Sequence, residues 1–154
     1  MKKLVECVPN ISEGNDLSVI NKIVETVEKY PGIKLLNVDP GKATNRTVIT
    51  FVGDADIIVD AAFKLISKAK ELIDMRKHFG EHPRMGAVDV CPLIPISGIS
   101  MEETINLAHK LSHRVGKELS IPVYCYENAA KENKRKNLAN CRAGEYEGLE
   151  NKFK

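Results

Sequence analysis

The side chains best suited to chemistry gather in the stretch RKHFGEHPRMGAVDVCP, which covers residues 76–92. It brings His78 and His82 within a few positions of Glu81 and Arg84. Residues that disfavour a continuous helix interrupt the stretch at Gly80, Pro83 and Gly86. We therefore expect a shaped loop, the kind of segment on which catalytic groups are often carried.

His82 is the leading candidate for a proton-transfer group. Imidazole both accepts and releases a proton near neutral pH, and Glu81 or Asp39 could orient its ring. A loop histidine can also do no more than hydrogen-bond to nearby backbone. The spacing alone leaves both interpretations of His82 open.

A metal site is an alternative use of the same residues. The pattern His78-x-x-Glu81-His82 matches the H-x-x-E-H signature of one group of zinc proteases. That site requires both histidines on one face of a helix. Gly80 inside the pattern and Pro83 just after it disfavour such a helix, so we expect no metal here.

Further candidates stand at the ends of predicted strands. Asp39, in the sequence VDPG, closes a strand and opens a turn, where its carboxylate could orient a histidine or cap backbone amides. Asn10 and Asn45 are similarly placed as ligands or turn formers. Arg46 and Arg84 could each hold a carboxylate through two parallel hydrogen bonds, although solvated surface arginines are common.

The elements that must position these groups follow from the spacing of apolar residues. That spacing predicts strands over 3–8, 33–38, 46–52, 88–94 and 121–126, and helices over 17–30, 55–75, about 101–115 and 128–138. Asp16 or Ser18 can cap the first helix, and Ser100 with Glu103 has the spacing of a capping box for the third.

The predicted order is βαββαβ, followed by a further helix, a strand and a terminal helix. Its first six elements spell the split βαβ of a ferredoxin-like sandwich, an α+β fold in which helices cover one face of a mostly antiparallel sheet. The other face has no cover in this pattern. Such an uncovered face, or a free sheet edge, is a candidate interaction surface.

Composition limits the class of protein. A chain of 154 residues with 43% hydrophobic residues suits one domain, and a net charge of +2 gives no field that would favour nucleic acid. The start MKKLVE lacks the apolar run of a signal peptide, and no segment is apolar enough to cross a bilayer, so we expect a cytoplasmic protein. The 4 scattered cysteines suggest neither a zinc knuckle nor a disulfide framework.

Three motifs carry a resemblance to a known family. The first motif is ECVPNISEG (Glu6–Gly14), the second is NVDPGKATNRTVITFVG (Asn37–Gly53), and the third is GEHPRMGAVDVCP (Gly80–Pro92). With RAGEYE at Arg142–Glu147 they span nearly the whole chain. The sequence resembles the N-terminal subdomain of glutamate formiminotransferase, the folate enzyme of histidine breakdown, as it also occurs in formiminotransferase-cyclodeaminase.

The resemblance implies a one-carbon transfer. The family moves a formimino group from N-formimino-L-glutamate to N5 of tetrahydrofolate, which serves as co-substrate. The histidine that matches His82 is the family's catalytic base, and it would take the proton from N5 and return it to the leaving amine. The implied catalytic group is His82, Asp39 and Glu81, and the implied substrate or folate contacts are Asn10, Asn45, Arg46, Arg84 and Gly86.

The family's catalytic unit has two subdomains, and residues 1–154 resemble only the first. We therefore expect the second subdomain to come from a separately encoded chain or from a second copy in a homodimer. The alternative is a noncatalytic ferredoxin-like module that binds folate, another small ligand or a protein and retains the loop for its shape.

Overall fold

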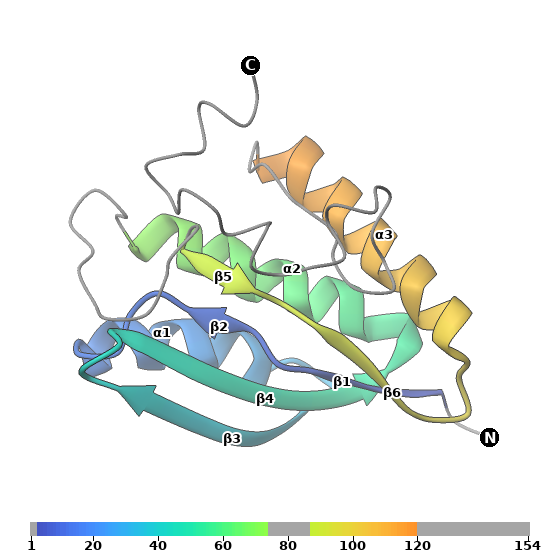
Figure 1. Ribbon diagram of the computed structural model, residues 1–154, viewed down its shortest axis with the longest axis horizontal. Helices are drawn as coiled ribbons and strands as arrows, with labels where there is room; N and C mark the ends of the chain where they lie inside the picture. Colours follow the sequence, from blue (N-terminus) through green and yellow to red (C-terminus); the bar gives the residue numbers. More distant parts are fainter. Residues whose placement is uncertain (1–2, 74–86, 120–154) are drawn as a thin grey trace.

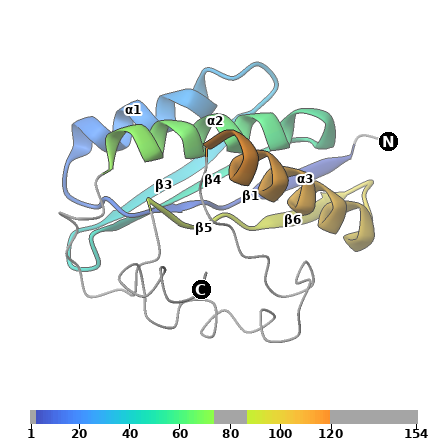
Figure 2. The ribbon, with the colours of Figure 1, turned by 90° about the horizontal axis from the view of Figure 1, so that it is seen from above.

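The computed structural model describes residues 3–73 and 87–119. In this part of the chain the helices lie on one side of a curled antiparallel sheet (Figures 1 and 2). The elements in chain order are β1 (Leu4–Cys7), β2 (Asn10–Ile11), α1 (Leu17–Glu28), β3 (Lys34–Gly41), β4 (Arg46–Asp54), α2 (Ala55–Leu72), β5 (Val88–Val90), β6 (Leu93–Ser97) and α3 (Met101–Leu119).

Strand β4 is central to the sheet. It pairs with β3 on one side and with β1 and β2 on the other, while β6 pairs with β1 and β5 pairs with β2. Every pairing is antiparallel, so β1 and β3 run parallel with β4 between them. This is the split βαβ arrangement, and it confirms the α+β, ferredoxin-like prediction. The strand expected at 121–126 and the helix expected at 128–138 lie outside the described residues.

Helix α1 begins where the sequence predicts. The Asp16 carboxylate accepts hydrogen bonds from the backbone N–H groups of Ser18 and Val19, which satisfies two donors that a helix start leaves open. The helix ends at Glu28, before Pro31 and before Gly32, whose φ of 87° suits glycine. Its buried stripe consists of Ile20, Ile23, Val24 and Val27.

The other two helices also begin at capping residues, of which the one before α3 was predicted. Asp54 caps α2 by accepting from the N–H of Asp56 at 2.9 Å. The Glu103 N–H donates to Ser100 Oγ at 3.1 Å and the Ser100 N–H donates to a Glu103 carboxylate oxygen at 3.3 Å, which confirms the capping box of α3. α2 ends at Leu72, earlier than the predicted Met75.

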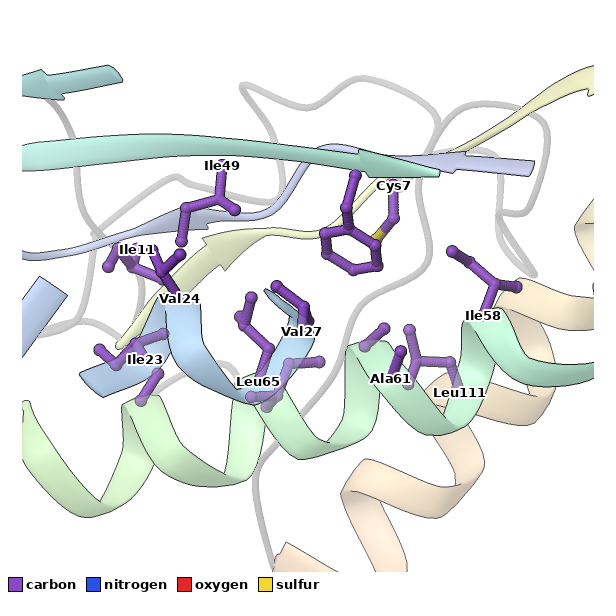
Figure 3. Packing of buried hydrophobic residues seen from close by; sticks show 14 of the residues in the cluster. Cys7, Ile11, Ile23, Val24, Val27, Ile49, Ile58, Ala61, Leu65 and Leu111 are labelled. Carbon is purple, nitrogen blue, oxygen red and sulfur yellow. The ribbon is translucent and has the colours of Figure 1, made fainter. Parts of the chain in front are cut away.

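The hydrophobic core lies between the sheet and helices α1 and α2, and Leu111 and Val115 of α3 also belong to it. Figure 3 shows Cys7, Ile11 and Ile49 on the strands facing Ile23, Val27 and Leu65 on the helices. Alternate residues of β4 are buried and the residues between them are partly exposed. Fully burying one aliphatic or aromatic side chain contributes about 1.5–3 kcal/mol to stability, so the apolar residues of β4 hold one face of the strand against the helices. Arg46 and Val48 alternate with these residues and therefore lie on the opposite face.

Two predicted strand boundaries were wrong. β3 continues to Gly41, so Asp39 lies inside the strand and not at its end. Pro40 is tolerated there because, within the described residues, β3 pairs only with β4. The single strand predicted over 88–94 is two strands, β5 and β6, because Pro92 has no N–H to offer a ladder.

The sheet face opposite the core carries exposed apolar side chains. Ile94 pairs with Glu6, whose neighbour Cys7 points into the core, so Ile94 points away from the helices. Leu36 and Ile96 are also exposed. No helix of the described residues covers this face (Figure 2).

Among the described residues no helix is long and apolar enough to cross a membrane. The cytoplasmic location stays a prediction.

Candidate functional site

The three motifs meet at one end of the sheet, although they are far apart in the sequence (Figure 1). The first motif supplies β2, which lies between β4 of the second motif and β5 of the third. Asn10 pairs with Val48 on one side and with Val90 on the other. β2 therefore joins all three motifs through backbone hydrogen bonds.

A buried polar cluster of Asn10, Arg46 and Asp89 lies at this junction. Arg46 Nε donates a hydrogen bond of 2.9 Å to the side-chain oxygen of Asn10, and Arg46 Nη2 lies 3.5 Å from a carboxylate oxygen of Asp89. The side chains of Arg46 and Asp89 are only 15% and 2% exposed. Asn10 in turn donates to the carbonyl oxygen of Val8 at 2.9 Å. We call these three residues the Arg46 cluster.

The Arg46 cluster gives Arg46 a structural role that the sequence did not predict. Arg46 was expected as a carboxylate anchor, and the structure shows it binding one residue each from the first and third motifs. A buried charge is costly without its partner, so Arg46 and Asp89 stabilise each other's position. Asp89 was not predicted as a site residue. The sequence does contain a signal for it, since Asp89 is a charged residue within the otherwise apolar run VDVCP. A carboxylate that is buried with such a run requires a polar or charged partner.

A second contact holds the end of the first motif against the turn of the second. The side-chain oxygen of Asn45 accepts hydrogen bonds of 2.9 Å from the Gly14 N–H and from Asn15 Nδ2. Asn45 has a φ of 50°, a left-handed conformation that asparagine tolerates better than most residues. A Cβ on Gly14 would lie 2.1 Å from the Gly41 carbonyl oxygen. This geometry supports a structural role for Asn45, and a ligand contact by Asn45 stays a prediction.

Asp39 shares a row of the sheet with Asn10. Asp39 pairs with Val48, and Val48 pairs with Asn10. Cross-strand partners project from the same face, and this row lies on the face opposite the buried Ile49. Asp39 is exposed there, with its Cα about 10 Å from that of Asn10, as two strand spacings require.

Four predicted site residues lie outside the described residues: Glu81, His82, Arg84 and Gly86. In the sequence they fall between α2 and β5, and the end of α2 and the start of β5 lie at the same end of the molecule as β2 (Figures 1 and 2). The Ser12 N–H donates to the Ala87 carbonyl oxygen at 2.8 Å. Ala87 is therefore bonded directly to the first motif.

The described residues contain no group of three or more histidine, cysteine, aspartate or glutamate side chains arranged to hold a metal ion. His78, Glu81 and His82, which matched the zinc-protease pattern, lie outside those residues. The prediction that this pattern holds no metal therefore stays a prediction.

The profile of the formiminotransferase domain, N-terminal subdomain, matches residues 4–154. The chain belongs to the formiminotransferase family. This result confirms the resemblance carried by the three motifs, and it covers the Arg46 cluster as well as the segment that contains His82.

The chain matches named relatives of different lengths. The formimidoyltransferase-cyclodeaminase of Dictyostelium discoideum is 51% identical over 154 residues, which are 100% of this chain and 29% of the relative. The glutamate formimidoyltransferase of Streptococcus pyogenes serotype M1 is 46% identical over 153 residues, which are 99% of this chain and 51% of the relative. The glutamate formimidoyltransferase of Thermoplasma acidophilum is 49% identical over 136 residues, 88% of this chain and 45% of the relative. The chain thus spans about half, or less, of the length of these relatives.

Proposed function

We propose that this chain supplies the catalytic histidine of a glutamate formimidoyltransferase. In this proposal the enzyme moves the formimino group of N-formimino-L-glutamate to N5 of tetrahydrofolate, a step of histidine degradation. The observation that carries the proposal is the meeting of the three motifs at β2, in a chain 46% identical to a relative named glutamate formimidoyltransferase. A transfer between two bound substrates requires its catalytic and binding groups to lie together, and the proposed groups come from all three motifs.

The proposed chemistry needs one group that moves a proton twice. The lone pair of N5 attacks the formimino carbon, and the resulting tetrahedral adduct carries a surplus proton on N5. His82 takes that proton and then gives it to the glutamate nitrogen as the bond from that nitrogen to carbon breaks. Tetrahydrofolate is consumed as a co-substrate, and the imidazole makes both proton transfers without a metal ion. Holding the two substrates side by side supplies much of the remaining rate increase.

Asp39 and Glu81 are proposed to orient the His82 ring. Support for Asp39 comes from its exposure in the row that also holds Asn10, on the face away from the core. The proposed contacts to formiminoglutamate or folate are Asn10, Asn45, Arg46, Arg84 and Gly86. The Arg46 cluster supports this role for Arg46 and Asn10, because groups that are held by neighbours bind a ligand with less loss of conformational freedom.

The second subdomain is proposed to dock on the sheet face opposite the core. Support comes from the exposed Ile94 and Ile96 on that face and from relatives about twice as long as this chain or longer. Docking there would close a cleft over Asp39 and would exclude water from the transferred group.

The experiment mixes the purified chain with the separately produced second half of the Streptococcus relative and measures formimino transfer to tetrahydrofolate. His82→Ala is expected to lower the rate by about 10²–10⁴-fold, the usual contribution of a general acid–base group. His113→Ala, on the exposed side of α3, is the matched control and should leave the rate unchanged. Equal rates for the wild type and His82→Ala with every tested partner would favour the noncatalytic binding module instead.

A further inference from the structure

We propose that Cys7 and Cys91 form a redox modification site, in which a peroxide or a small-molecule disulfide converts the two thiols into an internal disulfide. The two sulfur atoms are 3.5 Å apart, and both cysteines are free thiols. The residues come from different motifs and are 84 positions apart in the sequence. The inference does not depend on the proposed transfer reaction.

The backbone around the two cysteines already holds them in place. Cys7 lies in β1 and pairs with Leu93 of β6. The Val8 N–H donates to the Pro92 carbonyl oxygen at 3.2 Å, so the residues that follow each cysteine are directly bonded. A disulfide needs its sulfur atoms about 2 Å apart, which here requires a closure of about 1.5 Å. Cys91 lies in the connection between β5 and β6 and not inside a ladder, so a side-chain rotation and a small backbone shift can provide that closure.

The two thiols differ in how they meet an oxidant. Cys7 is fully buried in the core, where Figure 3 shows its sulfur beneath the sheet, whereas Cys91 is partly exposed. Burial, followed by the hydrogen bond shared with Cys91, holds the pKa of the Cys7 thiol well above its ordinary value. The thiolate is the reactive form, so Cys91 meets the oxidant first and Cys7 reacts second.

The chemistry balances with hydrogen peroxide as the oxidant. The Cys91 sulfur attacks one peroxide oxygen, the O–O bond breaks, and a sulfenic acid and one water molecule result. The Cys7 sulfur then attacks the Cys91 sulfur, the S–O bond breaks, and a second water molecule leaves with the remaining thiol proton. Two thiols have been oxidised to one disulfide, and one peroxide has been reduced to two waters. With a small-molecule disulfide the same product forms through a mixed disulfide on Cys91, and two small thiols are released.

The position of Cys91 links this modification to the Arg46 cluster. Cys91 is two residues beyond Asp89, whose carboxylate contacts Arg46, and Val90 between them pairs with Asn10. Drawing the Cys91 sulfur toward β1 therefore shifts the strand that carries Asp89. Oxidation at the core edge is expected to alter the junction of the three motifs.

The test uses the full chain with Cys125→Ser and Cys141→Ser, so that Cys7 and Cys91 are the thiols that remain. The protein is treated with hydrogen peroxide or with oxidised glutathione, and its intact mass and cross-linked peptides are measured. The expected result is the loss of two hydrogen atoms and a peptide joining Cys7 to Cys91, both reversed by dithiothreitol. Cys91→Ser in the same background should give no cross-link and no loss of hydrogen.

Two results would overturn the proposal. One is a stable gain of oxygen or glutathione on Cys91 without the cross-link, and the other is unreacted Cys7 and Cys91 under conditions that fully oxidise Cys125 and Cys141 in the wild-type chain. Circular dichroism of each variant establishes that it is folded, and Cys91→Ala replaces Cys91→Ser if the serine variant is not. The cross-link is read without any transfer assay, so its failure is distinct from failure of the proposed function.

Discussion

Arg46 donates from Nε to the side-chain oxygen of Asn10 over 2.9 Å, a bond between two residues that are 36 positions apart. The same guanidinium faces the buried carboxylate of Asp89 at 3.5 Å. One arginine therefore connects β4 with β2 and β5. The motifs that identify the family are thus also the segments that this contact holds together.

Replacing Arg46 by methionine should destabilise the chain strongly. The change removes the partner of Asp89, whose side chain is 2% exposed, and a buried charge left without its partner costs about 3–5 kcal/mol. Urea unfolding measures the loss. Arg46→Lys retains the charge and loses the Nε bond to Asn10, so its loss should be smaller, and Asp89→Asn added to Arg46→Met should recover part of the stability. A loss below about 1 kcal/mol for Arg46→Met would contradict the buried ion pair.

Gly14→Ala should destabilise the contact between the first and second motifs. The added Cβ would lie 2.1 Å from the Gly41 carbonyl oxygen and 2.5 Å from the Arg46 backbone nitrogen, so backbone must move. We expect a cost of at least about 1–3 kcal/mol, the usual range for overpacking. The matched control is Gly116→Ala in the exposed part of α3, which should raise stability by about 0.5–1 kcal/mol because alanine favours helix more than glycine does. Thermal unfolding compares the two, and equal effects would contradict the close approach at Gly14.

The stability of the chain should depend on pH through Asp60, which joins the three helices. Tyr30, which follows the end of α1, donates to one Asp60 carboxylate oxygen at 2.6 Å, and Arg114 of α3 donates to the other at 2.6 Å. The hydrogen bond from Tyr30, followed by that from Arg114, holds the pKa of Asp60 below its ordinary value. A carboxyl whose pKa is lowered by folding adds stability above its unfolded pKa and loses it as pH falls through the folded pKa.

We therefore expect the wild-type chain to lose more stability than Asp60→Asn as pH falls from neutral to below the ordinary aspartate pKa. The Asp60 side chain is 34% exposed, so solvent screening limits the difference to about 1 kcal/mol or less. Unfolding curves at a series of pH values measure it. Glu28→Gln, at an exposed position of α1, is the control and should leave the acid dependence as in wild type. Parallel curves for wild type and Asp60→Asn would show that the carboxylate is not held by its neighbours.

Asp39→Asn should lower formimino transfer without affecting folding. Asp39 is exposed on β3, so an amide of the same shape should leave the unfolding transition unchanged. If Asp39 orients His82, the amide would favour the wrong tautomer of the imidazole and reduce kcat by about 10²-fold or more. The measurement is kcat and its pH profile in the mixture with the second half of a relative, with Glu102→Gln on α3 as the control. An unchanged kcat for Asp39→Asn would leave Glu81 as the proposed orienting group.

The helices and their caps were predictable because their signals are local. Asp16 begins α1 and the Ser100–Glu103 capping box begins α3, as expected from residues a few positions apart. The course of β3 past Asp39 was not predictable, because it depends on pairing with Val48 in another strand. The break between β5 and β6 has a local signal in Pro92, although the apolar run on both sides of it favours one strand.

By itself the sequence determined the family, through its motifs. It also determined the helix starts and the split βαβ pattern, because apolar periodicity and capping residues act over short distances along the chain. It did not predict β2 or the division of β5 from β6. Only the tertiary structure decided that Arg46 binds Asn10 and faces Asp89, that Asp39 and Asn10 share one row, and that Cys7 meets Cys91. These contacts depend on the register in which the strands of the sheet pair. That register is set by burying Ile11, Ile49 and Phe51 against the helices, which are partners that no local sequence pattern specifies.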